Sequence, residues 1–174
     1  MRKVSLYIAA SLNGQIARCD GSIDWLPRPG KKQDYGYADF IRRVDTLVMG
    51  RKTYDQAVGL GNWPYGVRRS VVLSRTDCGR REAQAEFVAG DVADIVKELR
   101  AEPGGDIWLV GGGEVVRPCL AGRVIDEIIL SIPPLLLGEG IPLFLPRPLQ
   151  AKLHLRNCHA FPDGLVQLSY EVMN

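Results

Sequence analysis

The stretch Thr46-Leu47-Val48-Met49-Gly50-Arg51-Lys52-Thr53-Tyr54 changes from apolar to basic and polar within nine positions. Its first four residues are typical of a short buried strand, and after Gly50 we expect a helix from Arg51 to Val58. Two cations and a hydroxyl at a helix start suit a diphosphate, because the free N–H groups and the helix dipole also favour anions there. A solvated basic helix start would explain the same residues.

Strand-like runs alternate with helix-like segments through the first two thirds of the chain. The expected strands are residues 4–10, 46–49, 70–73, 85–89, 107–110 and 124–132. Between them, Asp91 is expected to cap a helix that runs to Ala101, and an apolar face predicts a short helix around Phe40. A third helix of about eight residues should follow Gly111-Gly112-Gly113 and end near Gly122. Such alternation predicts parallel βαβ units.

The C-terminal part reads as a hairpin. Lys152–His159 and Leu165–Val172 alternate apolar and polar residues, and Phe161-Pro162-Asp163-Gly164 joins them with turn-forming residues. We therefore expect one α/β domain over residues 1–174. It should be an open, twisted, mostly parallel sheet with helices on both faces and an antiparallel C-terminal hairpin. The hairpin has an apolar face and a free edge, which a homodimer would cover.

Composition argues against several classes of protein. The 22 Lys and Arg residues nearly balance the 20 Asp and Glu residues, which argues against a nucleic-acid binder that acts through bulk charge. The most apolar stretch, residues 128–137, contains two prolines and is far shorter than the ~20 residues of a membrane helix, so no membrane association is expected. No targeting segment is recognised at the start, so we expect a cytoplasmic protein.

The sequence gives no sign of a metal site. The four cysteines lack zinc-ligand spacings and are expected to be reduced thiols. His154 and His159 stand five apart in a strand-like stretch, so we expect them on opposite faces.

Two further strand ends suit anions. Ser74-Arg75 follows the strand at 70–73 and could hold another phosphate, although a surface turn explains it as well. Three glycines after the strand at 107–110 let a backbone approach a phosphate closely, although a tight strand–helix turn needs them too. They do not form the G-x-G-x-x-G fingerprint, because Val116 stands at its last glycine position. Three such ends in one small domain favour a long, multiply phosphorylated ligand.

The spacing of these segments resembles the dihydrofolate reductase superfamily, and within it the riboflavin-pathway reductases and their stand-alone relatives. The resemblance covers nearly the whole chain. Its most specific parts are Thr46 to Tyr54, Leu109-Val110-Gly111-Gly112-Gly113, and Asp126-Glu127-Ile128 followed by the stretch from Pro134 to Phe144. It implies a dihydrofolate-reductase-like fold.

The resemblance implies a nicotinamide cofactor and assigns residues to it. Ala9 and Ile16 would line the nicotinamide pocket. Ser74 and Arg75 would receive a 2′-phosphate, so the cofactor should be NADPH rather than NADH. The other residues implied for the diphosphate, the ribose and the adenosine end are Gly50, Arg51, Lys52, Thr53, Leu73, Val110, Gly111, Gly112, Gly113, Glu114, Val115 and Val116.

The substrate side departs from the dihydrofolate reductase pattern. Those enzymes carry a carboxylate about five residues after a loop tryptophan, but five residues after Trp25 stands Gly30. We take Asp34 as the candidate catalytic carboxylate, with a helix-capping role as the alternative. Asp24 and Trp25 are the candidate substrate-binding residues, and for Asp24 the alternative is a plain exposed loop residue. The departure argues against true dihydrofolate reductase activity.

The resemblance implies an NADPH-dependent reductase that transfers a hydride to a pyrimidine- or pterin-type substrate. The best single candidate is 5-amino-6-(5-phosphoribosylamino)uracil, whose phosphate needs a second anion site. Arg28, Lys31 and Lys32 could supply that site, although a solvated basic loop is the plainer interpretation. No His-x-Glu with a later Pro-Cys-x-x-Cys occurs in residues 1–174, so we do not expect this sequence to hold the zinc deaminase half that is often fused to such reductases.

Three other functions remain open. The first is dihydrofolate reductase. The second is a non-catalytic NADPH-binding relative. The third is a structural dimer that binds no cofactor, which would leave the basic strand ends unexplained.

Overall fold

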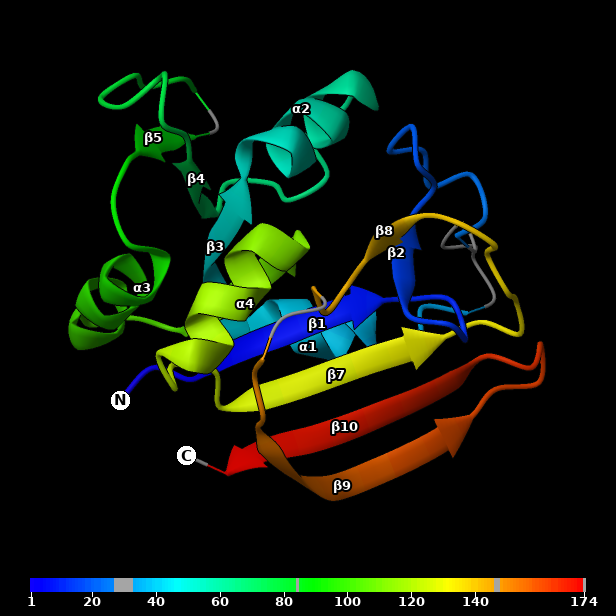
Figure 1. Ribbon diagram of the computed structural model, residues 1–174. Coiled ribbons are helices and arrows are strands. Elements are labelled where there is room, and N and C mark those ends of the chain that lie inside the picture. The colour runs from blue at the N-terminus through cyan, green and yellow to red at the C-terminus, as the bar shows by residue number, and fades with distance from the viewer. Residues whose placement is uncertain (27–32, 84, 146–147, 174) are drawn as a thin grey trace.

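The computed structural model describes residues 1–26, 33–83, 85–145 and 148–173. Its main sheet has eight strands in the order β5-β4-β3-β6-β1-β7-β10-β9 (Figure 1). These strands are β1 (Val4–Ala9), β3 (Val44–Gly50), β4 (Arg69–Leu73), β5 (Glu86–Val88), β6 (Asp106–Gly111), β7 (Glu127–Ile132), β9 (Lys152–Ala160) and β10 (Val166–Met173).

The first six strands of that order run parallel to one another, β10 runs opposite to them, and β9 returns to their direction. β1 pairs in parallel with β6 and β7, and β3 pairs in parallel with β4 and β6. β10 lies antiparallel between β7 and β9. The predicted open, mostly parallel sheet with an antiparallel C-terminal hairpin is therefore confirmed.

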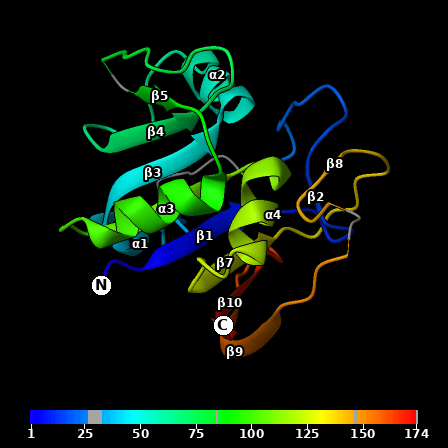
Figure 2. The ribbon, with the colours of Figure 1, turned by 60° about the vertical axis from the view of Figure 1, so that its left-hand side comes forward.

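Two helices cover each face of the sheet (Figure 2). The helices are α1 (Tyr37–Arg43), α2 (Arg51–Gly59), α3 (Val92–Ala101) and α4 (Gly113–Ala121). α3 and α4 pack on one face through residues such as Val96 and Val116, while α1 and α2 pack on the other through Phe40 and Tyr54. The predicted cap of α3 is confirmed, because the Asp91 side chain accepts hydrogen bonds from two backbone N–H groups.

A second, two-stranded sheet is absent from the sequence prediction. β2 (Gln15–Ala17) pairs antiparallel with β8 (Ile141–Pro142) and lies beside the carboxyl end of β1 (Figure 1). Strands of two or three residues carry no readable periodicity, and their pairing joins segments far apart in the chain. β7 also begins at Glu127, three residues later than the predicted start.

A buried arginine joins several elements at the amino end of the sheet. The side chain of Arg2 is 4% exposed and forms an ion pair with Asp45. It donates to the Leu99 carbonyl at 2.9 Å, the Gly105 carbonyl at 2.6 Å and Thr46 Oγ1 at 2.6 Å. One guanidinium thus links the start of β1 to β3, to the end of α3 and to the turn before β6.

The hairpin contradicts one expectation about the two histidines. His154 pairs with Glu171, and His159 pairs with Gln167, because an extra residue shifts the register of β9 near Ser169 of β10. Glu171 and Gln167 are four apart in β10, so both histidines lie on one face rather than on opposite faces. Within the described residues, no group of His, Cys, Asp and Glu side chains is arranged to hold a metal.

All four cysteines are free: Cys119 is buried, and the exposed ones are Cys19, Cys78 and Cys158. In the described parts of the chain, no helix has both the length and the apolar character that a membrane crossing requires.

Candidate functional site

The three anion-friendly segments and Ala9 lie at the ends of four neighbouring strands. β4, β3, β6 and β1 lie side by side in that order, and they end at Leu73, Gly50, Gly111 and Ala9. Because the strands are parallel, these ends meet at one edge of the sheet, near the start of α2 and of α4 (Figure 1). The carboxyl edge of an open parallel sheet is where such folds bind ligands.

Two helix starts face each other at this edge. The residues at the N-caps of α2 and α4 are Gly50 and Gly112, and neither helix has a side-chain cap. A Cβ on Gly112 would lie 3.6 Å from Thr53 Oγ1 of α2, in ordinary van der Waals contact, so the two helix starts lie close together. Gly112 has φ +90°, which a residue with a side chain rarely adopts. The uncapped N–H groups and the open backbone fit a diphosphate group.

Free cations flank the two helix starts. Lys52 and Arg75 are exposed, and among the described residues neither forms an ion pair or a side-chain hydrogen bond. Arg51 differs, because its guanidinium is paired with Asp55 and with Asp77. The residues present therefore fit a phosphorylated dinucleotide, with Lys52 beside the paired helix starts and Arg75 beyond β4.

The Ser74 hydroxyl also has a hydrogen-bond partner within the protein. Ser74 is buried, and its hydroxyl donates to Asp77 Oδ2 at 2.9 Å. The Thr76 hydroxyl donates to the same oxygen at 3.0 Å, and Arg51 pairs with it. These bonds, chiefly those from Ser74 and Thr76, hold the pKa of Asp77 below its usual range, so it is ionised at neutral pH.

The remaining residues assigned to the cofactor lie either at the strand ends or in the packing beneath them. Ala9, Leu73, Val110 and Glu114 lie at the strand ends or on the first turn of α4, and Ile16 lies in β2 against the core. Gly113 is buried against β8. A Cβ added to it would lie only 3.0 Å from the Pro142 carbonyl oxygen, which leaves a side chain too little space. Val115 and Val116 are core residues, so they support the turn rather than present a surface to a ligand.

Asp34 stands next to the start of α1. Its carboxylate accepts hydrogen bonds from the N–H groups of Ala38 at 3.0 Å and Gly36 at 3.1 Å. These two bonds, with that of Ala38 the stronger, lower the pKa of Asp34. A carboxylate held in this way favours the helix-capping role and is a weak proton donor at neutral pH. The adjacent Tyr35 carbonyl accepts from the Tyr7 hydroxyl, so this segment rests on β1.

Asp24 and Trp25 lie in the loop after β2. Asp24 is exposed and is paired with Arg18 at 2.6 Å. The ring of Trp25 is half-buried, and its Nε1 has no hydrogen-bond partner within the described chain. The Gln56 side chain of α2 donates to the Gly21 carbonyl at 2.8 Å, which fixes this loop beside α2. Arg28, Lys31 and Lys32 lie outside the described residues.

Two acidic residues of the site were not singled out in the sequence. Asp55 stands four positions after Arg51, which is a readable helix spacing for an ion pair. Asp77 stands three positions after Ser74, a spacing that suits a local side-chain turn.

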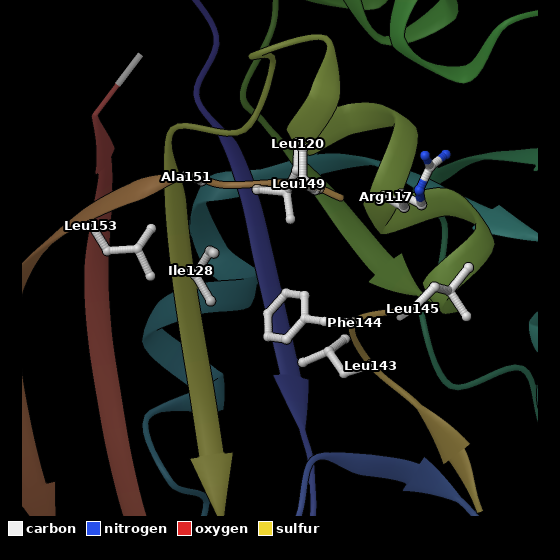
Figure 3. A pocket seen from close by; sticks show the side chains of 9 residues that line it. All are labelled: Arg117, Leu120, Ile128, Leu143, Phe144, Leu145, Leu149, Ala151 and Leu153. Atoms are coloured by element: carbon white, nitrogen blue, oxygen red, sulfur yellow. The ribbon is translucent and has the colours of Figure 1, made fainter. Parts of the chain in front are cut away.

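A separate apolar hollow lies away from the strand ends. It holds about 190 Å³ between α4, β7 and the chain that leads into β9 (Figure 3). Its side chains come mostly from leucines, with the ring of Phe144 near its centre. Phe144 is 49% exposed and Leu153 is 43% exposed, so apolar surface meets solvent here.

Comparison with known proteins gives consistent matches. The RibD C-terminal domain family matches residues 2–167. YwjB, an uncharacterized protein of Bacillus subtilis, is 38% identical over 97% of both chains. A dihydrofolate reductase of Mycobacterium tuberculosis is 35% identical over 76% of each chain. The crystal structure of a "putative riboflavin biosynthesis protein" from Shewanella sp. PV-4 superposes with a TM-score of 0.87 at 31% identity and covers 99% of both chains.

Proposed function

Since the chain belongs to the RibD C-terminal domain family, we propose that it is an NADPH-dependent reductase of a pyrimidine- or pterin-type substrate. The family and its neighbours support a reductase of riboflavin-pathway type. Within that class we propose 5-amino-6-(5-phosphoribosylamino)uracil as the substrate.

The observation that carries this proposal is the pair of uncapped helix starts at Gly50 and Gly112. They meet at the carboxyl edge of the sheet, beside the ammonium of Lys52, which has no ion pair among the residues that the structure describes. This arrangement supports diphosphate binding at the helix starts. The cofactor, when bound, supplies the hydride.

The chain's own residues have three tasks in such a reaction. The strand ends hold the dinucleotide, and the loop with Trp25 helps to enclose the substrate and to exclude water. Asp34 is proposed to anchor or protonate the substrate, although its two backbone hydrogen bonds favour an anchoring role over proton donation. Replacement by asparagine separates these roles, because an amide can still anchor but cannot supply a carboxyl proton.

Thermal unfolding with NADPH and with NADH tests cofactor binding first. A ligand at 100 times its dissociation constant adds about 2.7 kcal/mol of stability, or about 5–10 °C in Tm for a domain of this size. Lys52→Met should reduce the NADPH shift, whereas Lys152→Met, on the distant strand β9, should leave it unchanged. No shift with either nucleotide would refute the proposed cofactor site.

Turnover then tests the substrate. NADPH oxidation in the presence of the proposed intermediate supports the reductase, while oxidation only with dihydrofolate would favour the dihydrofolate reductase alternative, to which the 35% identical relative points. Tight NADPH binding without turnover of either acceptor, together with no effect of Asp34→Asn, would favour a non-catalytic binding protein.

We also propose that the protein forms a homodimer through its C-terminal hairpin. All nine residues of β9 are exposed, and Leu153, Leu155 and Phe144 offer apolar surface along one face. Light scattering should give twice the 19.2 kDa chain mass. Leu155→Arg should yield monomers. The control Val67→Arg, at a fully exposed site elsewhere, should remain a dimer. A native chain that is monomeric would contradict the proposal.

A further inference from the structure

The Asp77 carboxylate lies among the side chains assigned to a cofactor 2′-phosphate. Its Oδ2 accepts hydrogen bonds from Ser74 and Thr76 and pairs with the Arg51 guanidinium. Its Oδ1 lies 3.5 Å from the guanidinium of Arg80. Two hydroxyls and two guanidinium groups around one anion are the donors that bind a phosphate in other proteins.

The serine is committed to this carboxylate by geometry. Ser74 Oγ accepts a hydrogen bond from the Asp77 N–H at 3.2 Å, so its own hydrogen is left to point toward the carboxylate. Ser74 is buried, which leaves its hydroxyl little room to serve a second anion at the same time. Arg51 is shared in the same way, because its Nε pairs with Asp55 at 2.8 Å while its Nη1 pairs with Asp77.

The two nicotinamide nucleotides would meet Asp77 differently. The 2′-phosphate of NADPH would bring a second anion to a place that already holds one, and like charges in contact repel. The 2′-hydroxyl of NADH is neutral and can donate a hydrogen bond to a carboxylate oxygen.

We propose that Asp77 is a specificity-determining residue that occupies the 2′-phosphate site and reduces the preference for NADPH over NADH. The inference rests on the proposed function and sharpens it. Ser74 and Arg75 favour the 2′-phosphate, and Asp77 opposes it. Binding of NADPH therefore requires that the hydrogen bond between Ser74 and Asp77 break, whereas binding of NADH does not.

Calorimetric titration of Asp77→Asn tests this proposal, with Asp55→Asn as the matched control. Both variants remove a carboxylate that pairs with Arg51, but only Asp77 contacts Ser74. The ratio of the NADH to the NADPH dissociation constant should rise about tenfold in Asp77→Asn and by less than about twofold in Asp55→Asn. Adenosine 2′,5′-bisphosphate should gain affinity in Asp77→Asn as NADPH does, and adenosine 5′-monophosphate should not.

Each other outcome counts against the inference. A ratio that stays constant or falls in Asp77→Asn would show that Asp77 only positions Arg51. An equal rise in both variants would show a general charge effect around Arg51. If the native chain bound neither dinucleotide, the proposed function would fail and this inference with it; if it bound NADPH with an unchanged ratio in Asp77→Asn, only this inference would fail.

Discussion

Replacement of Arg2 by methionine tests the contribution of the buried guanidinium at the amino end of the sheet. Methionine keeps most of the aliphatic length and removes every donor. The Leu99 and Gly105 carbonyls, Thr46 Oγ1 and the Asp45 carboxylate then lose their shared partner.

The magnitude follows from the exposure of these groups. Breaking a buried ion pair by removing one partner costs about 3–5 kcal/mol. The Asp45 side chain is 47% exposed, so water can solvate the carboxylate left behind, and the lower end applies. We therefore expect a loss of about 3 kcal/mol, which lowers Tm by about 6–12 °C in a chain of this size.

Urea unfolding followed by circular dichroism measures this loss. The control is Arg18→Met, which removes a similar ion pair from an exposed loop and should leave the unfolding midpoint unchanged. A loss below about 1 kcal/mol for Arg2→Met would refute the reasoning, since that is the range of surface pairs. An equal shift of the unfolding midpoint in both variants would show that the burial of Arg2 does not increase its contribution to stability.

Three further outcomes follow from particular residues. Gly112→Ala should weaken NADPH binding at least about tenfold in a calorimetric titration, because φ +90° strains an alanine and its Cβ would stand beside Thr53 at the proposed diphosphate site. The control Gly59→Ala should bind NADPH normally, because a Cβ there meets no other atom within 4 Å. Asp34→Ala should lower the urea midpoint of unfolding at pH 7, because the pKa of Asp34 is lowered in the folded protein. The difference in midpoint between the variant and the native chain should vanish as the pH falls through that pKa. A difference that stays constant with pH would contradict this prediction. Burial raises the pKa of Cys119 to about 12, so a thiol reagent at pH 8 should titrate the three exposed cysteines of the native protein quickly and the fourth only after unfolding.

The fold could be predicted where local residue patterns decide the structure. The apolar run before Gly50, the Asp91 cap and the Pro-Asp-Gly turn each act within a few residues, and each lies where the sequence indicated. Pairing across long stretches of chain could not be predicted. β2 and β8 are too short to show a period, and the extra residue in β9 that places both histidines on one face exists only in the register with β10.

The candidate site shows the same division. Local spacing placed three anion-friendly segments at strand ends, and parallel pairing brings them to one edge. The sequence did not indicate that Ser74 and Arg51 already have an acidic partner, because Asp77 stands in an irregular loop whose path no local pattern predicts. Arg2 likewise looked like an ordinary basic residue near the start, since its four acceptors come from distant segments.

The position of the Arg2 contacts bears on how such a chain can change over generations. They hold the sheet at one end, and the loops proposed to choose cofactor and substrate lie at the other. A substitution near Ser74 or Trp25 leaves the Arg2 guanidinium and its acceptors untouched. Its effect on the free energy of unfolding is therefore independent of the contribution that the Arg2 contacts make. New ligand preferences can therefore be sampled at the carboxyl edge while the opposite end keeps the domain folded.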